Sequence, residues 1–350
     1  MQTPRRFPAW IDTYPRALAW TDIGTERGLG IIRRFVASTE AEGVISTDEP
    51  TLRWLTRKRG LFEPNCRVMA PSAEVLERLT SKAEQAEIAA EAGFHVLPTW
   101  YLNHAGDRLK IPEAQFPVCV RPAYPNSVQP AFKAKVLVSG NEMALWLASL
   151  RITHPLIAQP FRVGPNMIVH GVRDLQGTML ALTAYRTSRK YRGLAQSIEP
   201  MELTGELRDC CRRFIEASGI VGPFHFDLLY SDADACAWFL EVNARLGGTT
   251  AKVAGLGYDE PGLTMEAFGM ALPAGAALMP GRRRVTSKRS LAKQILRLLI
   301  AKDAELSYPV ESRPATLWHA LREMALISDA SLRLDDLEGS ALYLLRSYTP

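Results

Sequence analysis

The 350-residue sequence predicts an α/β (α+β) fold divided into two or three lobes. The first observation is the length, because a single hydrophobic core rarely grows beyond about 250–300 residues. The second is the alternation of short apolar runs with capped helical stretches along most of the chain. The third is a long hairpin pattern at residues 222–243. Hydrophobic residues make up 47% and charged residues 23% of the chain, as is usual for a globular protein.

The sequence totals argue against several other classes of protein. No apolar run approaches the roughly 20 residues of a membrane-spanning helix, and the N-terminus lacks the apolar segment of a signal peptide. The cysteines form no CxxC pair, and the six histidines show no zinc-ligand spacing. The cysteines are Cys66, Cys119, Cys210, Cys211 and Cys236. We therefore expect a cytoplasmic protein with reduced thiols.

Residues 1–78 are predicted to form a small α/β unit. Weak strand patterns occur at residues 17–20, 43–46 and 68–70. Between them, one helical pattern ends near Ser38, and a second opens at Asp48 and Pro50 and stops at Gly60. The unit is expected to be an irregular lobe that precedes the main sheet.

The signals become stronger from Ser81 onward. Ser81 and Glu84 have the spacing of a capping box, and Gly93 ends the helix that they begin. Further strands are predicted at residues 116–122, 136–138 and 156–162. The first two of these strands are joined by residues 123–134, a loop with two prolines and no glycine.

A short hairpin and a helix lead into the long hairpin. The short hairpin joins residues 167–173 to 178–186, and the helix covers residues 203–218 with Gly219 as its cap. Residues 187–193, TSRKYRG, are predicted to be a basic loop. This loop either orients a carboxylate or phosphate or is simply solvated, and the candidate residues are Arg186, Lys190 and Arg192.

Two carboxylates are predicted to face each other in the long hairpin. With the turn centred on Asp234, one strand face brings together His225 with Asn243, Asp227 with Glu241, and Leu229 with Phe239. The opposite face is predicted to be core and consists of Phe226, Leu228, Tyr230, Trp238, Leu240 and Val242. Like charges directly opposite each other are destabilising, so the two acids either face water or share a cation. Two carboxylates and an amide oxygen are hard ligands of the kind Mg²⁺ prefers.

A cation and flexible backbone follow the second strand, and both suit phosphate oxygens: Arg245 and Gly247-Gly248. The run Glu241-Val242-Asn243-Ala244-Arg245, with Asp227 fourteen residues before the glutamate, resembles the metal-binding signature of the ATP-grasp superfamily. The resemblance implies that Asp227, Glu241 and Asn243 hold two Mg²⁺ ions, or Mn²⁺, which bridge the phosphates of ATP. It also implies that Arg245 contacts the phosphoryl group that is transferred.

The same resemblance implies an ATP site in the first half of the chain. Arg121 matches a strand-end cation that contacts the α-phosphate. A second cation follows the lid loop, and Lys133 and Lys135 both match it, with Lys135 favoured. Gln159 and the backbone at Phe161 match the hinge that meets adenine. Lids of this superfamily are usually rich in glycine, and this lid departs from the pattern.

The resemblance covers roughly residues 81–270. It implies an ATP-grasp fold with a small N-terminal pre-ATP-grasp domain and a helical C-terminal extension. The expected boundaries are 1–78 for the shortened pre-ATP-grasp domain, 79–272 for the ATP-grasp domain, and 273–350 for a linker and a basic, mainly helical region. Within the second domain, the lid lobe is expected at about 115–160 and the metal-binding lobe at about 161–272.

The activity that the resemblance implies is that of a carboxylate–amine ligase. A substrate carboxylate attacks the γ-phosphate of Mg-ATP to give an acyl phosphate, and an amine then displaces phosphate. The expected partners are small-molecule carboxylate and amine substrates, because no nucleic-acid recognition motif occurs. The alternative is a non-catalytic ATP-binding regulatory or scaffold protein with a degenerate lid. The acceptor pocket is not defined by the fold, so the substrates cannot be read from the sequence.

The net charge of +5 is concentrated near the C-terminus. Residues 281–302 contain eight Lys or Arg residues and no acid. Apolar residues at helical spacing run through this segment: Leu291, Ile295, Leu298 and Leu299. Such a helix either lies on an anionic membrane or packs on the body of the protein or on the second subunit of a homodimer. Packing is favoured, since residues 312–348 supply further apolar positions, among them Leu317, Trp318, Leu321, Leu326, Leu342 and Leu345.

Overall fold

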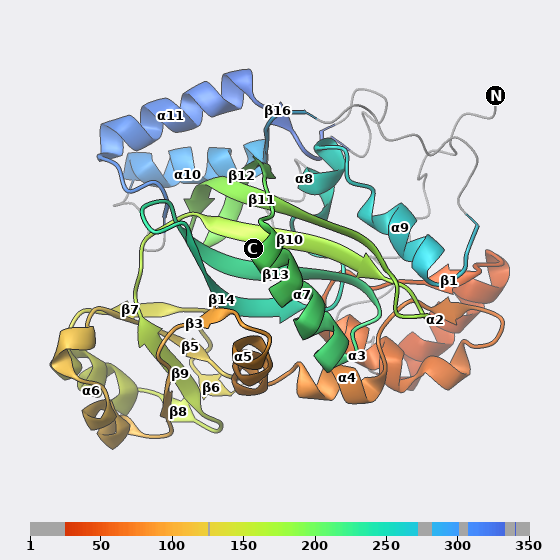
Figure 1. Cartoon of the computed structure of the whole chain (residues 1–350), viewed down its shortest axis with the longest axis horizontal. Helices are drawn as coiled ribbons and strands as arrows, with labels where there is room; N and C mark the ends of the chain where they lie inside the picture. Colours follow the sequence, from red (N-terminus) through yellow and green to blue (C-terminus); the bar gives the residue numbers. More distant parts are fainter. Residues whose placement is uncertain (1–24, 125–126, 272–281, 301–306, 333–339, 341–350) are drawn as a thin grey trace.

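The structure of the chain is a computed structural model that describes residues 25–124, 127–271, 282–300, 307–332 and 340 (Figure 1). The described residues form an N-terminal helical unit, a four-stranded sheet and a central eight-stranded sheet. The predicted α/β fold class is confirmed. The strand expected at residues 17–20, the linker at 273–280, and the apolar positions Leu342 and Leu345 lie outside the described residues.

In its described residues, the N-terminal unit contains four α-helices, one 3-10 helix and one parallel strand pair. Its elements are α2 (Glu26–Ser38), β1 (Gly43–Val44), α3 (Glu49–Arg57), the 3-10 helix η2 (Arg59–Leu61), β2 (Arg67–Val68), α4 (Ala73–Arg78) and α5 (Lys82–Glu91). The α-helices begin where a short polar side chain accepts a backbone N–H, and these caps are Thr25, Asp48, Ser72 and Ser81. The helix starts predicted at Asp48 and Ser81 are therefore confirmed.

The four-stranded sheet has its own helical cover and its own core. Its strand order is β4-β9-β5-β7, from β4 (Trp100–Leu102), β9 (Leu156–Pro160), β5 (Val118–Pro122) and β7 (Lys135–Leu137). A second pair joins β6 (Val128–Gln129) to β8 (Arg151–Ile152). The helices are α6 (Gly140–Ala148) and the 3-10 helices η3 (Ala105–Lys110) and η4 (Glu113–Gln115). The buried residues of this lobe form their own hydrophobic cluster. The lobe lies beside the central sheet (Figure 1), but the two do not share a hydrophobic core.

The central sheet has the strand order β16-β15-β12-β11-β10-β13-β14-β3. In chain order its strands are β3 (His95–Val96), β10 (Asn166–Arg173), β11 (Met179–Tyr191), β12 (Leu194–Met201), β13 (Gly222–Ser231), β14 (Cys236–Asn243), β15 (Val285–Thr286) and β16 (Ser328–Asp329). Its helices are α7 (Gly205–Ser218), α8 (Thr250–Gly255), α9 (Glu260–Ala267), α10 (Lys288–Ile300) and α11 (Arg313–Leu326). Among the described residues, none of the helices combines the length and apolar character that crossing a bilayer requires.

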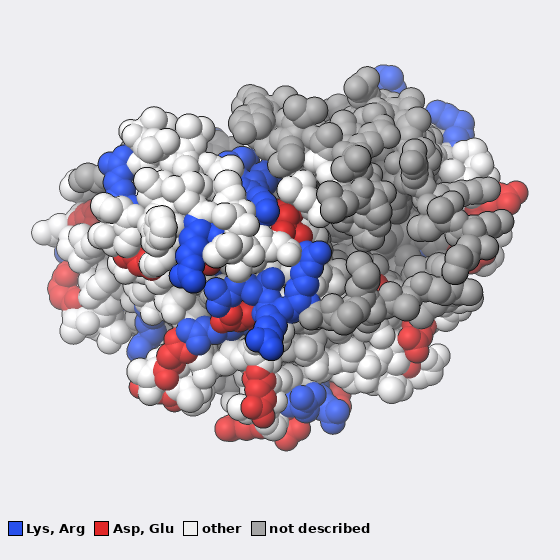
Figure 2. All heavy atoms as spheres, turned by 90° about the horizontal axis from the view of Figure 1, so that it is seen from above, with Lys and Arg blue, Asp and Glu red and all other residues white. Residues whose placement is uncertain are grey.

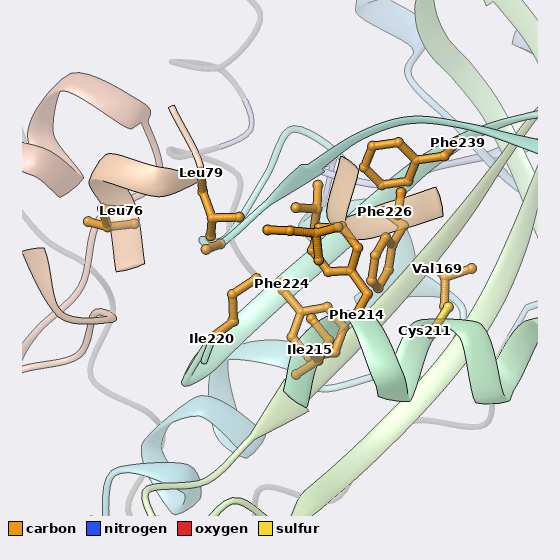
Figure 3. Packing of buried hydrophobic residues seen from close by; sticks show 14 of the residues in the cluster. Leu76, Leu79, Val169, Cys211, Phe214, Ile215, Ile220, Phe224, Phe226 and Phe239 are labelled. Carbon is orange, nitrogen blue, oxygen red and sulfur yellow. The ribbon is translucent and has the colours of Figure 1, made fainter. Parts of the chain in front are cut away.

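One face of the central sheet carries the main core. Phe226 of β13 packs edge-on against Phe214 of α7 at 5.2 Å between ring centroids, and Phe94 lies 5.4 Å from Phe226 (Figure 3). Each such aromatic pair adds about 0.5–1.5 kcal/mol beyond its buried area. Helix α7 ends at Gly219, whose φ of +74° is a left-handed conformation that glycine adopts without strain. The opposite face of the sheet is covered by α8 and α9, and it is the face that carries the polar residues described below.

The prediction of a basic loop at residues 187–193 is wrong. Strand β11 continues to Tyr191, and only Arg192 and Gly193 form the turn to β12. The reason is tertiary pairing. Thr187 and Arg189 are buried between β12 and the C-terminal helices, so polar side chains are tolerated in this strand.

The C-terminal region contributes two strands that the sequence did not predict. Strand β15 pairs with β12, and β16 pairs with β15, so both extend the central sheet. Leu291 and Leu298 of α10 are buried, Ile295 is half-buried, and Leu299 is exposed. The favoured prediction that this helix packs on the body of the protein is confirmed by its buried side, although the predicted stripe was wrong at Leu299.

Candidate functional site

The two hairpin carboxylates face each other as predicted. Asp227 of β13 lies directly opposite Glu241 of β14, and His225 lies opposite Asn243. Ile168 of β10 pairs with Asp227 on the other side, so the carboxylates lie near the middle of the sheet. The predicted register of this part of the hairpin is confirmed.

The rest of the hairpin differs from the prediction because of a β-bulge next to Asp227. Beyond the bulge, Leu228 pairs with Phe239 and Leu229 with Trp238. Phe239 therefore lies in the main core instead of on the carboxylate face. Trp238 is only half-buried, and the guanidinium carbon of Arg162 lies 4.7 Å from the centre of its ring. One extra residue in a strand reverses the faces of all residues after it, and this explains the error.

The surroundings shift the pKa values of the two carboxylates in opposite directions. Burial and the charge of Glu241 raise the pKa of Asp227 above its usual range. The ammonium group of Lys82 is the largest influence on Glu241 and lowers its pKa, with a smaller contribution from Arg121. Glu241 thus forms an ion pair with Lys82.

Lys82 is a site residue that the sequence reasoning missed. It occupies the first turn of α5, and its Nζ donates a short hydrogen bond to Oε2 of Glu241. Gln85, one turn later, accepts from the backbone N–H of Val242 at 2.8 Å and donates to its carbonyl at 3.2 Å. The start of α5 is therefore fixed against β14. The capping box at Ser81 was the available signal, because it marks where this lysine begins the helix.

The residues present fit a divalent cation between β13 and β14. The carboxylates of Asp227 and Glu241 repel each other across the strands, and Oδ1 of Asn243 lies on the same face. No group of three His, Cys, Asp or Glu side chains that would hold a metal occurs among the described residues. A cation here would therefore need ligands from outside the chain, as the phosphates of a nucleotide provide.

Arg121 and Gln159 lie together on the four-stranded sheet. Nη2 of Arg121 donates to Oε1 of Gln159 at 2.7 Å, and Gln159 donates to Thr99 at 2.9 Å. Arg121 is also close enough to lower the pKa of Glu241, so it faces the carboxylate pair. The predicted strand-end position of Arg121 thus places its charge between the two sheets.

The other nucleotide residues predicted from the sequence occupy different environments. Lys135 is half-buried on β7, opposite Val120, whereas Lys133 is exposed in the preceding loop. The backbone N–H of Phe161 donates to the carbonyl of Pro117 at 2.8 Å. That N–H is therefore engaged within the chain in this structure.

Arg245 links the hairpin to the N-terminal unit. Its Nη2 donates to Oδ1 of Asn243 at 3.3 Å, and its Nη1 donates to the carbonyl of Leu246 at 3.0 Å. Its Nε lies 3.7 Å from a carboxylate oxygen of Glu49 on α3 and has no hydrogen-bond partner among the described residues. The guanidinium is thus held beside Asn243 of the hairpin and forms an ion pair with Glu49 of α3.

Lys190 is the residue of the basic segment that approaches the carboxylates. Its side chain is buried, its Nζ donates to Oδ1 of Asn166 at 2.8 Å, and Asp227 interacts with it electrostatically. Burial lowers the pKa of Lys190 to about 8, although Asp227 opposes the shift. Arg186 instead donates to Asp232 at 2.6 Å, and Arg192 lies in the turn.

Tyr308 covers Lys190 from the C-terminal region. The backbone N–H of Lys190 donates to the carbonyl of Tyr308 at 2.7 Å, and the reverse bond measures 3.1 Å. The Tyr308 ring centre lies 5.9 Å from Nζ of Lys190. Residues after 281 therefore help to enclose the polar face, a role that no motif in the sequence indicated.

A buried polar network supports the loop that follows β14. His170 and Glu260 have no solvent exposure, and Nδ1 of His170 lies 2.7 Å from Oε1 of Glu260. The other ring nitrogen of His170 lies 2.9 Å from the Thr249 hydroxyl. The Thr250 hydroxyl donates to Oε2 of Glu260 at 2.6 Å and accepts from the backbone N–H of Gly247 at 2.9 Å. The loop is thus tied to both β10 and α9.

Gly247 is required by close packing against His225. A Cβ atom at this position would lie 2.4 Å from Cε1 of His225, which stacks on His170 at 5.2 Å between ring centroids. The lowered pKa of His225, caused mainly by burial, keeps its ring neutral. The glycine therefore allows the backbone after Arg245 to approach the sheet closely.

Comparison with known proteins relates the sequence to a ligase. No family model matches the sequence. D-alanine–D-alanine ligase from Pseudomonas fluorescens is 30% identical over 166 residues, which cover 42% of this chain and 50% of that protein. The chain thus matches half the length of this curated relative.

Comparison with solved structures relates the architecture to carboxylases and a synthetase. Biotin carboxylase from Campylobacter jejuni, in a β,γ-ATP complex, has a TM-score of 0.58 and 15% identity over 84% of this chain and 82% of its own. The biotin carboxylase domain dimer of Hydrogenobacter thermophilus 2-oxoglutarate carboxylase, with MgADP and bicarbonate, has a TM-score of 0.57 and 13% identity, covering 73% and 60%. An ADP complex of N5-carboxyaminoimidazole ribonucleotide synthetase has a TM-score of 0.56 and 12% identity, covering 81% and 79%. At these identities the likeness is one of fold.

Proposed function

The chain has the ATP-grasp fold, and from this premise we propose that it is an ATP- and Mg²⁺-dependent ligase that joins a small carboxylic acid to an amine. The observation that carries the proposal is the alignment of Asp227 with Glu241, with the oxygen of Asn243 beside them. These oxygens are surrounded by cations from four different elements, namely Lys82, Arg121, Lys190 and Arg245. Such a site holds the metal and the phosphates of a nucleotide at one place.

In the proposed reaction, a carboxylate oxygen of the substrate forms a bond to the γ-phosphorus of ATP. The bond from that phosphorus to the β,γ-bridging oxygen breaks, which gives an acyl phosphate and ADP. The amine nitrogen then attacks the acyl carbon, inorganic phosphate leaves, and one amine proton is released. Mg²⁺ would supply charge neutralisation between the phosphates and the carboxylates of Asp227 and Glu241.

The residues of the chain have separate roles in this proposal. Arg245 contacts the phosphoryl oxygens, since its guanidinium lies against Oδ1 of Asn243 beside the carboxylate pair. Arg121 contacts the phosphates from the four-stranded sheet, and Lys135 is the better placed of the two lysines because it lies on a paired strand. Lys190 holds the substrate carboxylate or the γ-phosphate, since its charge faces Asp227. Lys82 keeps Glu241 ionised until a metal binds.

The second candidate function is nucleotide binding without transfer. The loop at residues 123–134 has no glycine, and glycine amides commonly wrap phosphates. The test is to incubate the protein with Mg-ATP and pools of carboxylic acids and amines and to measure ADP and phosphate. Release that requires both an acid and an amine supports the ligase. Tight ATP binding with no release under any combination of substrates supports the second candidate instead.

Arg121→Ala is expected to weaken Mg-ATP binding about tenfold to a hundredfold, because a charge-assisted contact contributes about 1.5–3 kcal/mol. Calorimetric titration with a non-hydrolysable ATP analogue measures the change. Arg151→Ala, an exposed position on β8, is the matched control and should bind as the unmodified chain does. Unchanged affinity in both Arg121→Ala and the Lys133→Ala/Lys135→Ala double variant would remove the phosphate role from this lobe.

A further inference from the structure

Helices α10 and α11 carry an unusual share of exposed apolar side chains. Of fifteen large hydrophobic residues that are exposed among the described residues, seven lie between positions 296 and 326. Six lie on the helices, namely Leu296, Leu299 and Ile300 on α10 and Trp318, Leu321 and Leu326 on α11, and Val310 lies between the helices. Scattered single residues of this kind are normal, but a concentration on two neighbouring helices marks an interaction surface.

The exposed residues share the outward faces of the two helices. On α11, Trp318, Leu321 and Ala325 follow one another at helical spacing and are exposed, whereas Thr316 and Ala320 on the other side are buried. On α10, the inner residues are Leu291, Gln294 and Leu298, and the outer residues are Lys293, Leu296, Arg297 and Ile300. The helices lie side by side (Figure 1), and Arg313 of α11 donates to the carbonyl of Leu298. We call this combined surface the outer face of α10 and α11.

The charge on the outer face is almost entirely positive. Helix α10 carries four cations and no acid, and those of α10 and α11 that are exposed are Lys293, Arg297, Arg313 and Arg322. The single acid of α11, Glu323, points inward, where it accepts from Ser197 and lies 3.6 Å from Arg189. Viewed from above, blue Lys and Arg side chains lie beside a broad area of uncharged residues, and red acids lie next to several of them (Figure 2).

We propose that the outer face of α10 and α11 docks on an anionic lipid surface. Exposed Trp and Leu among Lys and Arg, with no exposed acid, is the composition of helices that lie in the membrane interface. A second copy of the chain is a poorer occupant, because a two-fold interface would join two copies of a face that carries cations and no exposed acid. An acidic protein would satisfy the cations but would leave unexplained why the apolar residues occupy the outermost positions.

Docking would leave the carboxylate site free to work. Asp227 and Glu241 lie on β13 and β14, whereas α11 contacts β12, which is separated from β13 by β11 and β10 in the strand order. The apolar side chains would enter the boundary between headgroups and acyl chains, and the cations would contact lipid phosphates. The lipid-docking proposal is therefore independent of the proposed ligase function, and an experiment can contradict one without contradicting the other.

Vesicle co-sedimentation of the full chain tests the proposal. Binding is expected to phosphatidylserine–phosphatidylcholine vesicles and not to pure phosphatidylcholine vesicles, and it should weaken as ionic strength rises. Lys293→Gln/Arg297→Gln/Arg322→Gln should lower the partition coefficient about a hundredfold, since each cation near the surface contributes about fivefold. Trp318→Gln/Leu321→Gln should lower it by at least tenfold.

The matched control is Leu145→Gln, which removes an exposed leucine from α6 on the four-stranded lobe. This control should bind vesicles as the unmodified chain does, and all variants should keep the circular dichroism spectrum and melting temperature. Absence of binding to phosphatidylserine vesicles at low ionic strength would overturn the proposal. So would a dimer in solution that Trp318→Gln/Leu321→Gln converts to monomer, because the face would then be covered by a second copy.

Discussion

Glu241→Gln is expected to lower nucleotide turnover by about 10²–10³-fold or more, because it removes one of two carboxylates that would hold the metal at the phosphates. The substitution keeps the size of the side chain and leaves the apolar face of β14 unchanged. It also removes the ionic partner of Lys82. ADP release in the presence of the active substrate pair, measured by a coupled assay, gives the rate, and urea denaturation shows whether the fold is retained.

The matched control is Asp234→Asn in the turn of the same hairpin. Asp234 is exposed, and its contacts are with Ser231, so its carboxylate does not reach the site. This variant should turn over ATP at the rate of the unmodified chain. Turnover of Glu241→Gln at that same rate would show that the carboxylate pair does not hold the catalytic metal.

Glu260→Ala is expected to lower the free energy of unfolding by about 2–5 kcal/mol, because each donor left without an acceptor costs about 1–3 kcal/mol. The carboxylate of Glu260 accepts from His170 and from Thr250, and none of its surface reaches solvent. Its loss would leave Nδ1 of the buried His170 and the hydroxyl proton of the part-buried Thr250 without their acceptor. Urea denaturation followed by fluorescence measures the change.

Two variants on the same helix distinguish the loss of this hydrogen-bond network from the effect of shortening a side chain. Glu266→Ala removes an exposed carboxylate from α9 and should change stability by less than about 0.5 kcal/mol. Glu260→Gln keeps an acceptor for one partner, so its free energy of unfolding should lie between those of Glu260→Ala and Glu266→Ala. A loss of less than about 1 kcal/mol for Glu260→Ala would mean that water replaces the carboxylate and that the network does not stabilise the loop.

The local features were predictable because their causes lie within a few residues. Ser81 caps α5 through its own backbone neighbours, and the period of two along residues 222–243 places Asp227 opposite Glu241 once the turn is located. The prediction of the carboxylate pair required nothing from the rest of the chain. The roles assigned to these residues remain a proposal, which the Glu241→Gln experiment tests.

The features that the sequence did not reveal depend on distant contacts. The bulge beside Asp227 is an extra residue, and the alternation of side chains looks regular on both sides of it. Lys82 contacts Glu241, which lies 159 positions later in the chain. Tyr308, from the C-terminal region, covers Lys190 of β11. Strands β15 and β16 contain two residues each, too few for any periodic signal.

The order of the central sheet also determines when the sheet is completed during synthesis. Its outer strands on one side, β15 and β16, come from residues 285–286 and 328–329, long after the carboxylate hairpin. At 5–20 residues per second, the ribosome needs roughly 2–9 s to extend the chain from Asn243 to Thr286, the end of β15. During that interval the outer edge of β12 has no neighbour, and an open strand edge is a template for association with other chains. The yield of folded protein is therefore expected to depend on what shields that edge until β15 has been made.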